Sequence, residues 1–207
     1  MGLKMKILME KIDRNLEKNK YLEMLKCLIE YEADKIQRFM KYEDSLTSLY
    51  GKYMIKKYLG VDKLNLSYNQ WKKPFLVDFP NTHINISHSH EWVVVAIDEN
   101  PVGIDIEKIQ YIDMSIAKSF FSKSESEYIF SLHKEKQLEE FYKIWTIKEA
   151  YIKWKGMGMY IDLNSFDVVI DNNRAYIYTK GKKEKCLVYL KKIENEYILS
   201  YCVEDVK

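Results

Sequence analysis

The sequence predicts an α+β protein made of two similar α+β halves. A helix-like segment followed by a strand-like segment occurs at residues 52–56 with 91–96, and again at 148–153 with 196–201. This repeat indicates duplication of one α+β unit. Hydrophobic residues make up 47% of the chain and only three residues are proline, as expected of a globular protein. We therefore expect an N-terminal half at residues 1–101 and a C-terminal half at 102–207.

Apolar spacing predicts both helices and strands in the first half. The expected elements are a weakly patterned strand at residues 6–12, a helix over 18–41, a second helix ending at 59, and strands at 83–89 and 92–97. Asp44 or Ser45 is the expected N-cap of the second helix, and Gly60 ends it. Lys73 and Pro74 then interrupt the pattern, because proline and the residue before it disfavour helix.

The second half begins with a strand at residues 102–107. Further helices are expected at 113–121, from 124 onwards, and at 138–155, and further strands at 166–170, 175–179, 187–193 and 197–203. Gly156 and Gly158 end the last of these helices, which has the strongest helical pattern in the chain. Asn172 and Asn173 make a natural hairpin turn between two of the strands.

Composition narrows the possible functions. The 33 basic and 31 acidic residues nearly cancel, which argues against a general binder of nucleic acid or of membrane surfaces. Cys27, Cys186 and Cys202 lack metal-ligand spacing and are interpreted as free thiols in a reducing compartment. The sequence has no apolar run of about 18 residues and no signal-peptide pattern. We therefore expect a cytoplasmic protein.

Two carboxylates share one face of the strand at residues 102–107. Apolar residues alternate there with Gly103, Asp105 and Glu107. The Cα atoms of Asp105 and Glu107 should lie about 6.6 Å apart. Carboxylates about 5 Å apart repel each other by about 3 kcal/mol at an effective dielectric constant of about 20. Such repulsion calls for a cation or a proton, although a solvated acidic strand face gives the same pattern.

The helix at residues 138–155 adds a third acidic residue. Glu149 and Lys153 are four residues apart and therefore lie on one face of the helix. An ordinary surface pair explains this spacing, whereas a functional interpretation places Glu149 beside the two strand carboxylates and leaves Lys153 for a nearby anion. Three carboxylates suit Mg²⁺, and no His or Cys cluster favours zinc.

The strand at residues 83–89 ends in a dense polar stretch. Ser87, His88 and Ser89 offer hydroxyl and imidazole donors suited to phosphate oxygens, although a polar strand end without a ligand is the alternative interpretation. The sequence contains no P-loop, no dinucleotide-binding glycine motif and no hydrolase nucleophile elbow.

Three segments in this order closely resemble the 4′-phosphopantetheinyl transferases of the larger, surfactin-synthetase-activating type. They are residues 83–89 (HINISHS), 102–107 (VGIDIE) and 145–153 (WTIKEAYIK). The resemblance covers most of the chain and implies two similar α+β halves with the active site in the cleft between them. It also implies Mg²⁺-dependent transfer of 4′-phosphopantetheine from coenzyme A to a serine of an apo acyl or peptidyl carrier protein, with release of adenosine 3′,5′-bisphosphate.

The resemblance assigns roles to individual residues. Asp105, Glu107 and Glu149 are expected to bind Mg²⁺, and Glu149 and Lys153 to act in catalysis, with Glu149 as the candidate base. The residues expected to bind coenzyme A are Lys35 and Ser48 near the 3′-phosphate, Lys73 and Pro74 along the adenine, and Ser87, His88 and Lys153 at the other phosphates.

Two positions depart from the family pattern. Lys72 stands where the family has glycine, which calls into question the close backbone approach that glycine allows. Glu32 stands where relatives of this type often carry a second basic residue for the 3′-phosphate. We therefore expect either weaker binding of coenzyme A or compensation by Lys72.

The carrier protein is expected to dock on the apolar side of residues 112–121, formed by Ile112, Ile116, Phe120 and Phe121. Core packing competes for at least one of the two Phe residues. Because one chain carries both halves, the protein is expected to work as a monomer. Two alternatives stay open: a non-catalytic coenzyme A or carrier-protein binding module of the same fold, and a Mg²⁺-dependent phosphatase or nuclease. The second would need an organised nucleophile or a strong basic patch, and the sequence shows neither.

Overall fold

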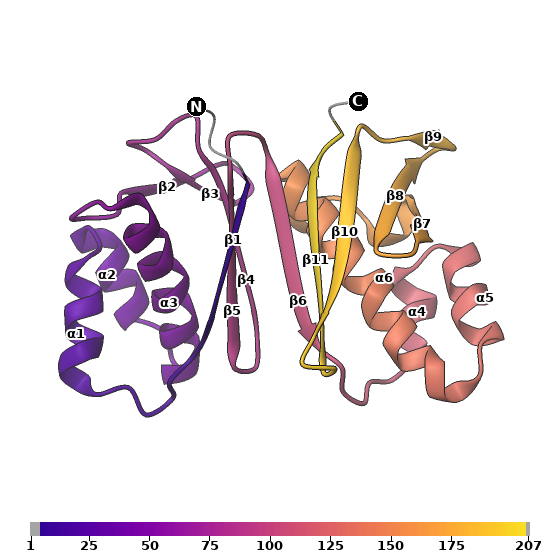
Figure 1. The fold of residues 1–207 in the computed structure, drawn as a ribbon, viewed down its shortest axis with the longest axis horizontal. Helices are drawn as coiled ribbons and strands as arrows, with labels where there is room; N and C mark the ends of the chain where they lie inside the picture. The colour runs from indigo at the N-terminus through magenta and orange to yellow at the C-terminus, as the bar shows by residue number, and fades with distance from the viewer. Residues whose placement is uncertain (1–4, 206–207) are drawn as a thin grey trace.

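The computed structural model describes residues 5–205. The three-stranded and the six-stranded sheet pack against each other in the middle of the molecule, and helices lie on the outer side of each of them (Figure 1). The indigo-to-magenta half and the orange-to-yellow half are thereby placed back to back. None of the described helices is both long enough and apolar enough to cross a membrane.

The first half places helices on one face of a small antiparallel sheet. Its elements are β1 (Lys6–Lys11), α1 (Lys18–Lys26), α2 (Glu30–Gln37), α3 (Tyr42–Leu59), β2 (Leu66–Tyr68), β3 (Pro74–Leu76), β4 (His83–Ser89) and β5 (Trp92–Asp98). Strands β1, β5 and β4 pair in that order, and β2 pairs separately with β3.

The second half places its longest helix over a larger antiparallel sheet. Its elements are β6 (Val102–Lys108), α4 (Ser115–Phe120), α5 (Lys123–Ser131), α6 (Lys134–Lys155), η1 (Gly158–Tyr160), η2 (Leu163–Ser165), β7 (Asp167–Asp171), β8 (Arg174–Thr179), β9 (Lys182–Lys183), β10 (Cys186–Ile193) and β11 (Tyr197–Glu204). The strand order is β6-β11-β10-β8-β7, and β9 pairs with β8.

The two halves repeat one arrangement. In the first half, β1 pairs with the hairpin β4–β5 and α3 packs on the sheet. In the second half, β6 pairs with the hairpin β10–β11 and α6 packs on the sheet. The order β1-β5-β4 therefore corresponds to β6-β11-β10. The predicted α+β fold with two similar halves is confirmed.

Strand β5 is buried on both faces, which explains its continuous apolar sequence. Val93, Val95 and Ile97 belong to the core beneath the helices of the first half. Val94 and Ala96 point the other way and pack with apolar residues of β6 and β11. This sheet-on-sheet contact joins the two halves.

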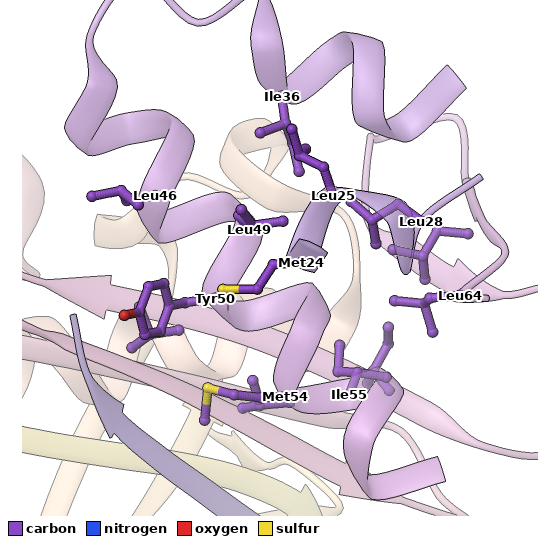
Figure 2. Close-up of a cluster of buried hydrophobic side chains, with 14 of the residues drawn as sticks. Met24, Leu25, Leu28, Ile36, Leu46, Leu49, Tyr50, Met54, Ile55 and Leu64 are labelled. Atoms are coloured by element: carbon purple, nitrogen blue, oxygen red, sulfur yellow. The ribbon is translucent and has the colours of Figure 1, made fainter. Parts of the chain in front are cut away.

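The helix predicted over residues 18–41 is instead two helices, α1 and α2. The break falls at Leu28, which forms a parallel bridge with Leu64, and Leu64 N donates to Cys27 O at 2.8 Å. Leu28 is buried in the same core as residues of both helices, including Met24 and Ile36 (Figure 2). The apolar periodicity continues through the break because both helices cover one core.

Two further helices begin earlier than predicted. Helix α3 starts at Tyr42, so neither Asp44 nor Ser45 is its N-cap, and it ends as predicted at Gly60 with a left-handed φ of +67°. Helix α6 starts at Lys134, one turn before the predicted position.

Helix α5 has a different N-cap from the one predicted at residue 124. The Ser122 hydroxyl accepts from Glu125 N, and the Glu125 carboxylate accepts from Ser122 N at 2.9 Å. This reciprocal pair is a capping box, which ends the preceding extended segment and starts the helix. The predicted helix at 113–121 is shortened accordingly to α4.

Candidate active site

The two halves meet where strand β4 runs beside strand β6. Across this junction Asn85 Oδ1 accepts from Ile104 N at 2.8 Å, and Ser89 Oγ accepts from Lys108 N at 3.1 Å. Asn85, Ser87 and Ser89 alternate along β4, so they face the same way, and all three are buried. The polar end of this strand therefore faces the acidic strand.

Asp105 and Glu107 each accept a hydrogen bond from a serine of β4. Ser87 Oγ donates to Asp105 Oδ1 at 2.8 Å, and Ser89 Oγ donates to Glu107 Oε2 at 2.8 Å. Asp105 is only 3% exposed, and Glu107 is half-buried. The two carboxylates share one face of the strand, but protein covers that face. The solvated-face interpretation therefore does not apply.

Gly103 lets helix α6 cross strand β6 at close range. A Cβ atom at this position would overlap main-chain atoms of Ala150 and Trp154. No side chain fits there, so the crossing depends on glycine. The same crossing brings the face of α6 that carries Glu149 and Lys153 towards the acidic strand.

Lys153 binds the acidic strand directly. Its Nζ lies 2.6 Å from Asp105 Oδ1 and 3.0 Å from Ser87 Oγ. The lysine that was predicted to serve a nearby anion is thus held by a carboxylate of β6 and a hydroxyl of β4. Residues from three elements, α6, β6 and β4, meet at this point.

The three predicted carboxylates influence one another. Burial raises the pKa of Glu107 to about 7, and repulsion from Asp105 and Glu149 adds to the effect. Burial also raises the pKa of Glu149, with a further contribution from Asp105. Upward pKa shifts of this kind arise when carboxylates of like charge share a partly desolvated site.

The carboxylates suit a cation in chemistry, but residues 5–205 include no group of three or more His, Cys, Asp or Glu side chains arranged to hold a metal ion. Asp105 Oδ2 is buried, and no described group forms a hydrogen bond with it. This buried oxygen without a partner, together with the pKa values of Glu107 and Glu149 that burial raises, fits a cation as a ligand of these carboxylates. Carboxylate oxygens are ligands that Mg²⁺ prefers.

A pocket of about 340 Å³ lies beside the junction in the first half. Ser48, Pro74 and His88 are among the residues that line it. His88 points into this pocket, away from Ser87, because the two residues are consecutive on β4. The surrounding protein partly desolvates the ring, which lowers the pKa of His88, and the nearby Lys153 lowers it further.

Glu32 forms a buried ion pair with Lys52 at this pocket. The Glu32 carboxylate is fully buried, and its Oε2 lies 3.0 Å from Lys52 Nζ and accepts from the Tyr68 hydroxyl at 2.9 Å. Lys52 Nζ also donates to Ser48 Oγ at 3.0 Å. Lys35 Nζ lies 3.8 Å from the centre of the Tyr68 ring. The acid that departs from the family pattern is therefore neutralised by Lys52.

The loop between β2 and β3 contains Lys72 and Lys73. Lys72 adopts φ +66°, the left-handed conformation that glycine takes readily, so its departure from the pattern does not prevent the turn. Lys73 Nζ donates to Lys153 O at 2.6 Å and to Val102 O at 3.1 Å. The ammonium group of Lys73 is therefore bound to main-chain oxygens of the second half.

The predicted docking face is only partly at the surface. Phe120 is 47% exposed and packs edge-on against Trp145. Phe121 is 3% exposed, lies beside Phe141 and belongs to the core, so including it in a docking surface was wrong. Ile112 and Ile116 are half-buried against the same core.

The prediction missed three residues that shape this region. Asn85 lies two residues before Ser87, so strand alternation already placed it on the junction face. Lys52 lies one helical turn after Ser48, a spacing that predicts one shared face. Asn69 donates through Nδ2 to Gly156 O at 3.1 Å, and no local pattern in the sequence indicates this contact.

Comparison with known proteins identifies the family to which this chain belongs. Residues 101–202 match the family model of the 4′-phosphopantetheinyl transferase superfamily, and residues 15–100 match that of 4′-phosphopantetheinyl transferase, N-terminal. The chain is 42% identical over 178 residues to 4′-phosphopantetheinyl transferase gsp of Aneurinibacillus migulanus, which covers 82% of this chain and 74% of that protein.

Two further relatives extend the comparison. The chain is 31% identical over 198 residues to 4′-phosphopantetheinyl transferase Sfp of Bacillus subtilis (strain 168), covering 92% of this chain and 88% of that protein. It is 32% identical over 184 residues to the Homo sapiens L-aminoadipate-semialdehyde dehydrogenase-phosphopantetheinyl transferase, covering 74% of this chain and 59% of that protein. The chain therefore belongs to the 4′-phosphopantetheinyl transferases, enzymes that attach phosphopantetheine to carrier proteins.

Proposed function

We propose that the protein transfers 4′-phosphopantetheine from coenzyme A to a serine of an apo acyl or peptidyl carrier protein in a Mg²⁺-dependent reaction. The observation that carries this proposal is the meeting of Lys153, Asp105 and Ser87 at the junction, next to two carboxylates with raised pKa values. Phosphate transfer needs positive charge and hydroxyl donors beside a group that accepts a proton, and this junction offers all of them.

Asp105, Glu107 and Glu149 are the residues that would hold Mg²⁺. When bound, the ion would neutralise charge on the phosphate oxygens of coenzyme A. The buried and unpartnered Oδ2 of Asp105 supports this assignment. Binding of the ion would also favour the ionised form of Glu107, whose pKa burial raises to about 7.

The residues around the junction would orient the diphosphate. The Lys153 ammonium and the His88 ring come from α6 and β4, and each offers a donor to phosphate oxygens. The Ser87 hydroxyl, which donates to Asp105 Oδ1, would turn to do the same when the ligand binds. The carrier serine Oγ would form the new bond to the phosphorus that carries the pantetheine arm. The bond from that phosphorus to the bridging oxygen would break, and adenosine 3′,5′-bisphosphate would leave with the electron pair.

Glu149 is the proposed acceptor of the serine proton. Burial raises the pKa of Glu149 in the metal-free protein. With Mg²⁺ bound the pKa would fall, as for Glu107, and Glu149 would act as the base in its ionised form. Lys153 is on the same face of α6, one turn away, and would compensate the negative charge that develops on the leaving phosphate.

The pocket beside α3 is the proposed site of the 3′-phosphate. Ser48 and Lys52 lie in its wall, and Lys35 stands over Tyr68 at its edge. We propose that Lys52 Nζ donates a hydrogen bond to the 3′-phosphate, with its own charge balanced by Glu32. Glu32 holds Lys52 in place through their buried ion pair.

We also propose that the carrier docks on the exposed part of α4 around Phe120.

We further propose that one molecule is active by itself. The junction uses β4 from residues 1–101 and β6 and α6 from residues 102–207, and the two family matches divide at residues 100 and 101. The sheet-on-sheet core supports a stable intramolecular cleft. Light scattering at micromolar concentration should give a mass near 24.9 kDa.

The transfer reaction has a direct test. The protein is mixed with coenzyme A, Mg²⁺ and several apo carrier proteins, and each carrier is weighed by mass spectrometry. A gain of one phosphopantetheine that depends on Mg²⁺ is expected. Binding of coenzyme A and carrier without any mass gain would indicate a non-catalytic module, whereas hydrolysis of coenzyme A without carrier modification would indicate a phosphatase.

A further inference from the structure

The loop between β2 and β3 caps a helix that belongs to the opposite half. Lys73 Nζ donates to Lys153 O at 2.6 Å and to Val102 O at 3.1 Å. Asn69 Nδ2 donates to Gly156 O at 3.1 Å. The last carbonyl groups of a helix have no partner within the helix, and a positive charge near them is favourable. The Gly156 amide closes this end of α6 from within the helix, through bonds to Ile152 O and Lys153 O. The first half therefore adds side-chain donors to a helix end that is already closed by its own glycine.

The loop is built to present both donors. Asn69 Oδ1 accepts from Trp71 N at 3.0 Å and from Lys73 N at 2.8 Å, and Lys72 N donates to Asn69 O at 2.9 Å. At the other side, a Cβ atom on Gly156 would lie 3.1 Å from Lys73 Cδ. Glycine at the helix end therefore leaves room for the lysine stem.

Apolar packing alone does not explain why residue 73 is a lysine. Within residues 5–205 no carboxylate forms an ion pair with Lys73, and its partners are carbonyl oxygens. Burial lowers the pKa of Lys73 to about 8, which shows that the folded protein disfavours the charge. A methionine would fill the same space without burying a charge, but it would take this donor away from Val102 O and Lys153 O. The charged donor is retained for something other than packing.

Other residues hold both the main chain and the side chain of Lys153. Its main-chain oxygen accepts from Lys73, and its ammonium group binds Asp105 and Ser87. We propose that Lys73 and Asn69 are positioning residues that fix Lys153 for the transfer reaction by capping α6 from the opposite half. The inference rests on the role proposed above for Lys153. It gives Lys73 a task beyond the ligand contact expected from the family resemblance.

The proposed link joins the nucleotide side of the site to the reacting side. The β2–β3 loop continues into Pro74, which lines the proposed 3′-phosphate pocket, while the loop's donors hold the end of α6. A small displacement of a group that must meet a reacting phosphate can lower the rate by about a hundredfold. Loss of the cap should therefore act on kcat more than on the binding of coenzyme A.

The first test is a double-mutant cycle in the full-length enzyme. Lys73→Met should lower kcat by about tenfold or more and change the KM for coenzyme A by less than about threefold. Lys73→Met added to Lys153→Met should cost almost nothing further, because Lys73 acts through Lys153. Lys63→Met, which removes an exposed positive charge from the first half, serves as the control and should retain wild-type kcat.

Asn69→Asp is the second variant, in case Lys73→Met folds poorly. Aspartate keeps the oxygen that organises the loop but replaces the donor that faces Gly156 O with an acceptor. It should lower kcat in the same direction as Lys73→Met. Independent, multiplicative losses in the double-mutant cycle, or a rise in KM at constant kcat, would overturn the inference and leave Lys73 as a ligand contact.

Amide hydrogen exchange gives a readout that does not depend on activity. In Lys73→Met the Gly156 amide, which closes the end of α6, should exchange about tenfold faster or more. The Gly60 amide closes α3 with a similar left-handed cap and is the internal control, so its exchange should not change. Unchanged exchange at Gly156 would refute the cap. If the wild-type protein leaves every carrier unmodified while Lys73→Met still shows the exchange effect, the proposed function is refuted and the cap is retained.

Discussion

Lys153 Nζ lies 2.6 Å from Asp105 Oδ1, and this ion pair joins helix α6 to strand β6. The Asp105 side chain is 5% exposed and the Lys153 side chain 25%, so the pair is largely shielded from water. The Ser87 hydroxyl contacts both partners from β4. This contact makes the acidic strand, the helix and the first half parts of one site.

Asp105→Asn should abolish transfer and weaken the fold. The variant removes the charge that binds Lys153, which should lower the free energy of unfolding by about 1–3 kcal/mol. Glu107→Gln is the matched variant: it should also reduce transfer strongly, but without Mg²⁺ its stability at neutral pH should hold or rise, because the amide relieves carboxylate repulsion. Carrier mass spectrometry and chemical denaturation measure both effects. A folded Asp105→Asn enzyme with near-normal activity would contradict the assignment.

The stability of the metal-free protein should carry a pH signature of Glu107. Burial raises the pKa of Glu107 from 4.5 to about 7, so between these values the folded state binds the proton more tightly than the unfolded state. Its stabilising contribution is full below pH 4.5 and is lost as the pH rises through 7, with an upper limit of about 3 kcal/mol. The difference in unfolding free energy between wild type and Glu107→Gln should fall over this range. A flat difference would show that Glu107 ionises normally.

The Glu32–Lys52 pair should control recognition of the 3′-phosphate. Lys52→Met alone would leave Glu32 buried and unpaired, at a cost of about 3–5 kcal/mol. The double variant Glu32→Gln/Lys52→Met removes both charges and should fold. Its KM for coenzyme A should rise about tenfold, which corresponds to about 1.4 kcal/mol, while that for 3′-dephospho-coenzyme A should stay unchanged. An equal rise for both substrates would remove Lys52 from the phosphate site.

Gly103→Ala should separate α6 from β6. The added Cβ would overlap main-chain atoms of Ala150 and Trp154, so we expect a loss of about 3 kcal/mol or more in unfolding free energy, and a loss of transfer. Gly181→Ala is the control, because Gly181 has φ +75° but no neighbouring atom within 4 Å of an added Cβ. It should cost about 1 kcal/mol and retain activity. Equal costs for the two variants would contradict close crossing at Gly103.

Replacing the neighbouring residues Phe120 and Phe121 should change two different properties, carrier binding for Phe120 and stability for Phe121. Phe120→Ala should raise the KM for the carrier several-fold, leave that for coenzyme A unchanged, and hardly affect stability. Phe121→Ala removes a core side chain and should cost about 3–5 kcal/mol. Steady-state kinetics with each substrate varied in turn, together with thermal unfolding, distinguish the two residues. A Phe120→Ala enzyme with an unchanged carrier KM would exclude this docking face.

The sequence by itself determined the features that depend on local periodicity. Alternation along residues 102–107 placed Asp105 and Glu107 on one face, and helical spacing placed Glu149 and Lys153 on another. The repeated order of helix and strands, together with the family resemblance, predicted two similar α+β halves. The strands β4, β5, β10 and β11 were likewise close to their predicted ranges.

Only the tertiary structure decided the contacts between segments that are distant in the chain. Phe120 and Phe121 are equally apolar, and which of them is buried depends on where Phe141 and Trp145 of α6 lie. Lys73 Nζ donates to main-chain oxygens of the other half, and the pairing of Leu28 with Leu64 separates α1 from α2. Local propensity cannot determine such outcomes, because the energy of each contact depends on a partner that is brought near only by the packing of the two halves.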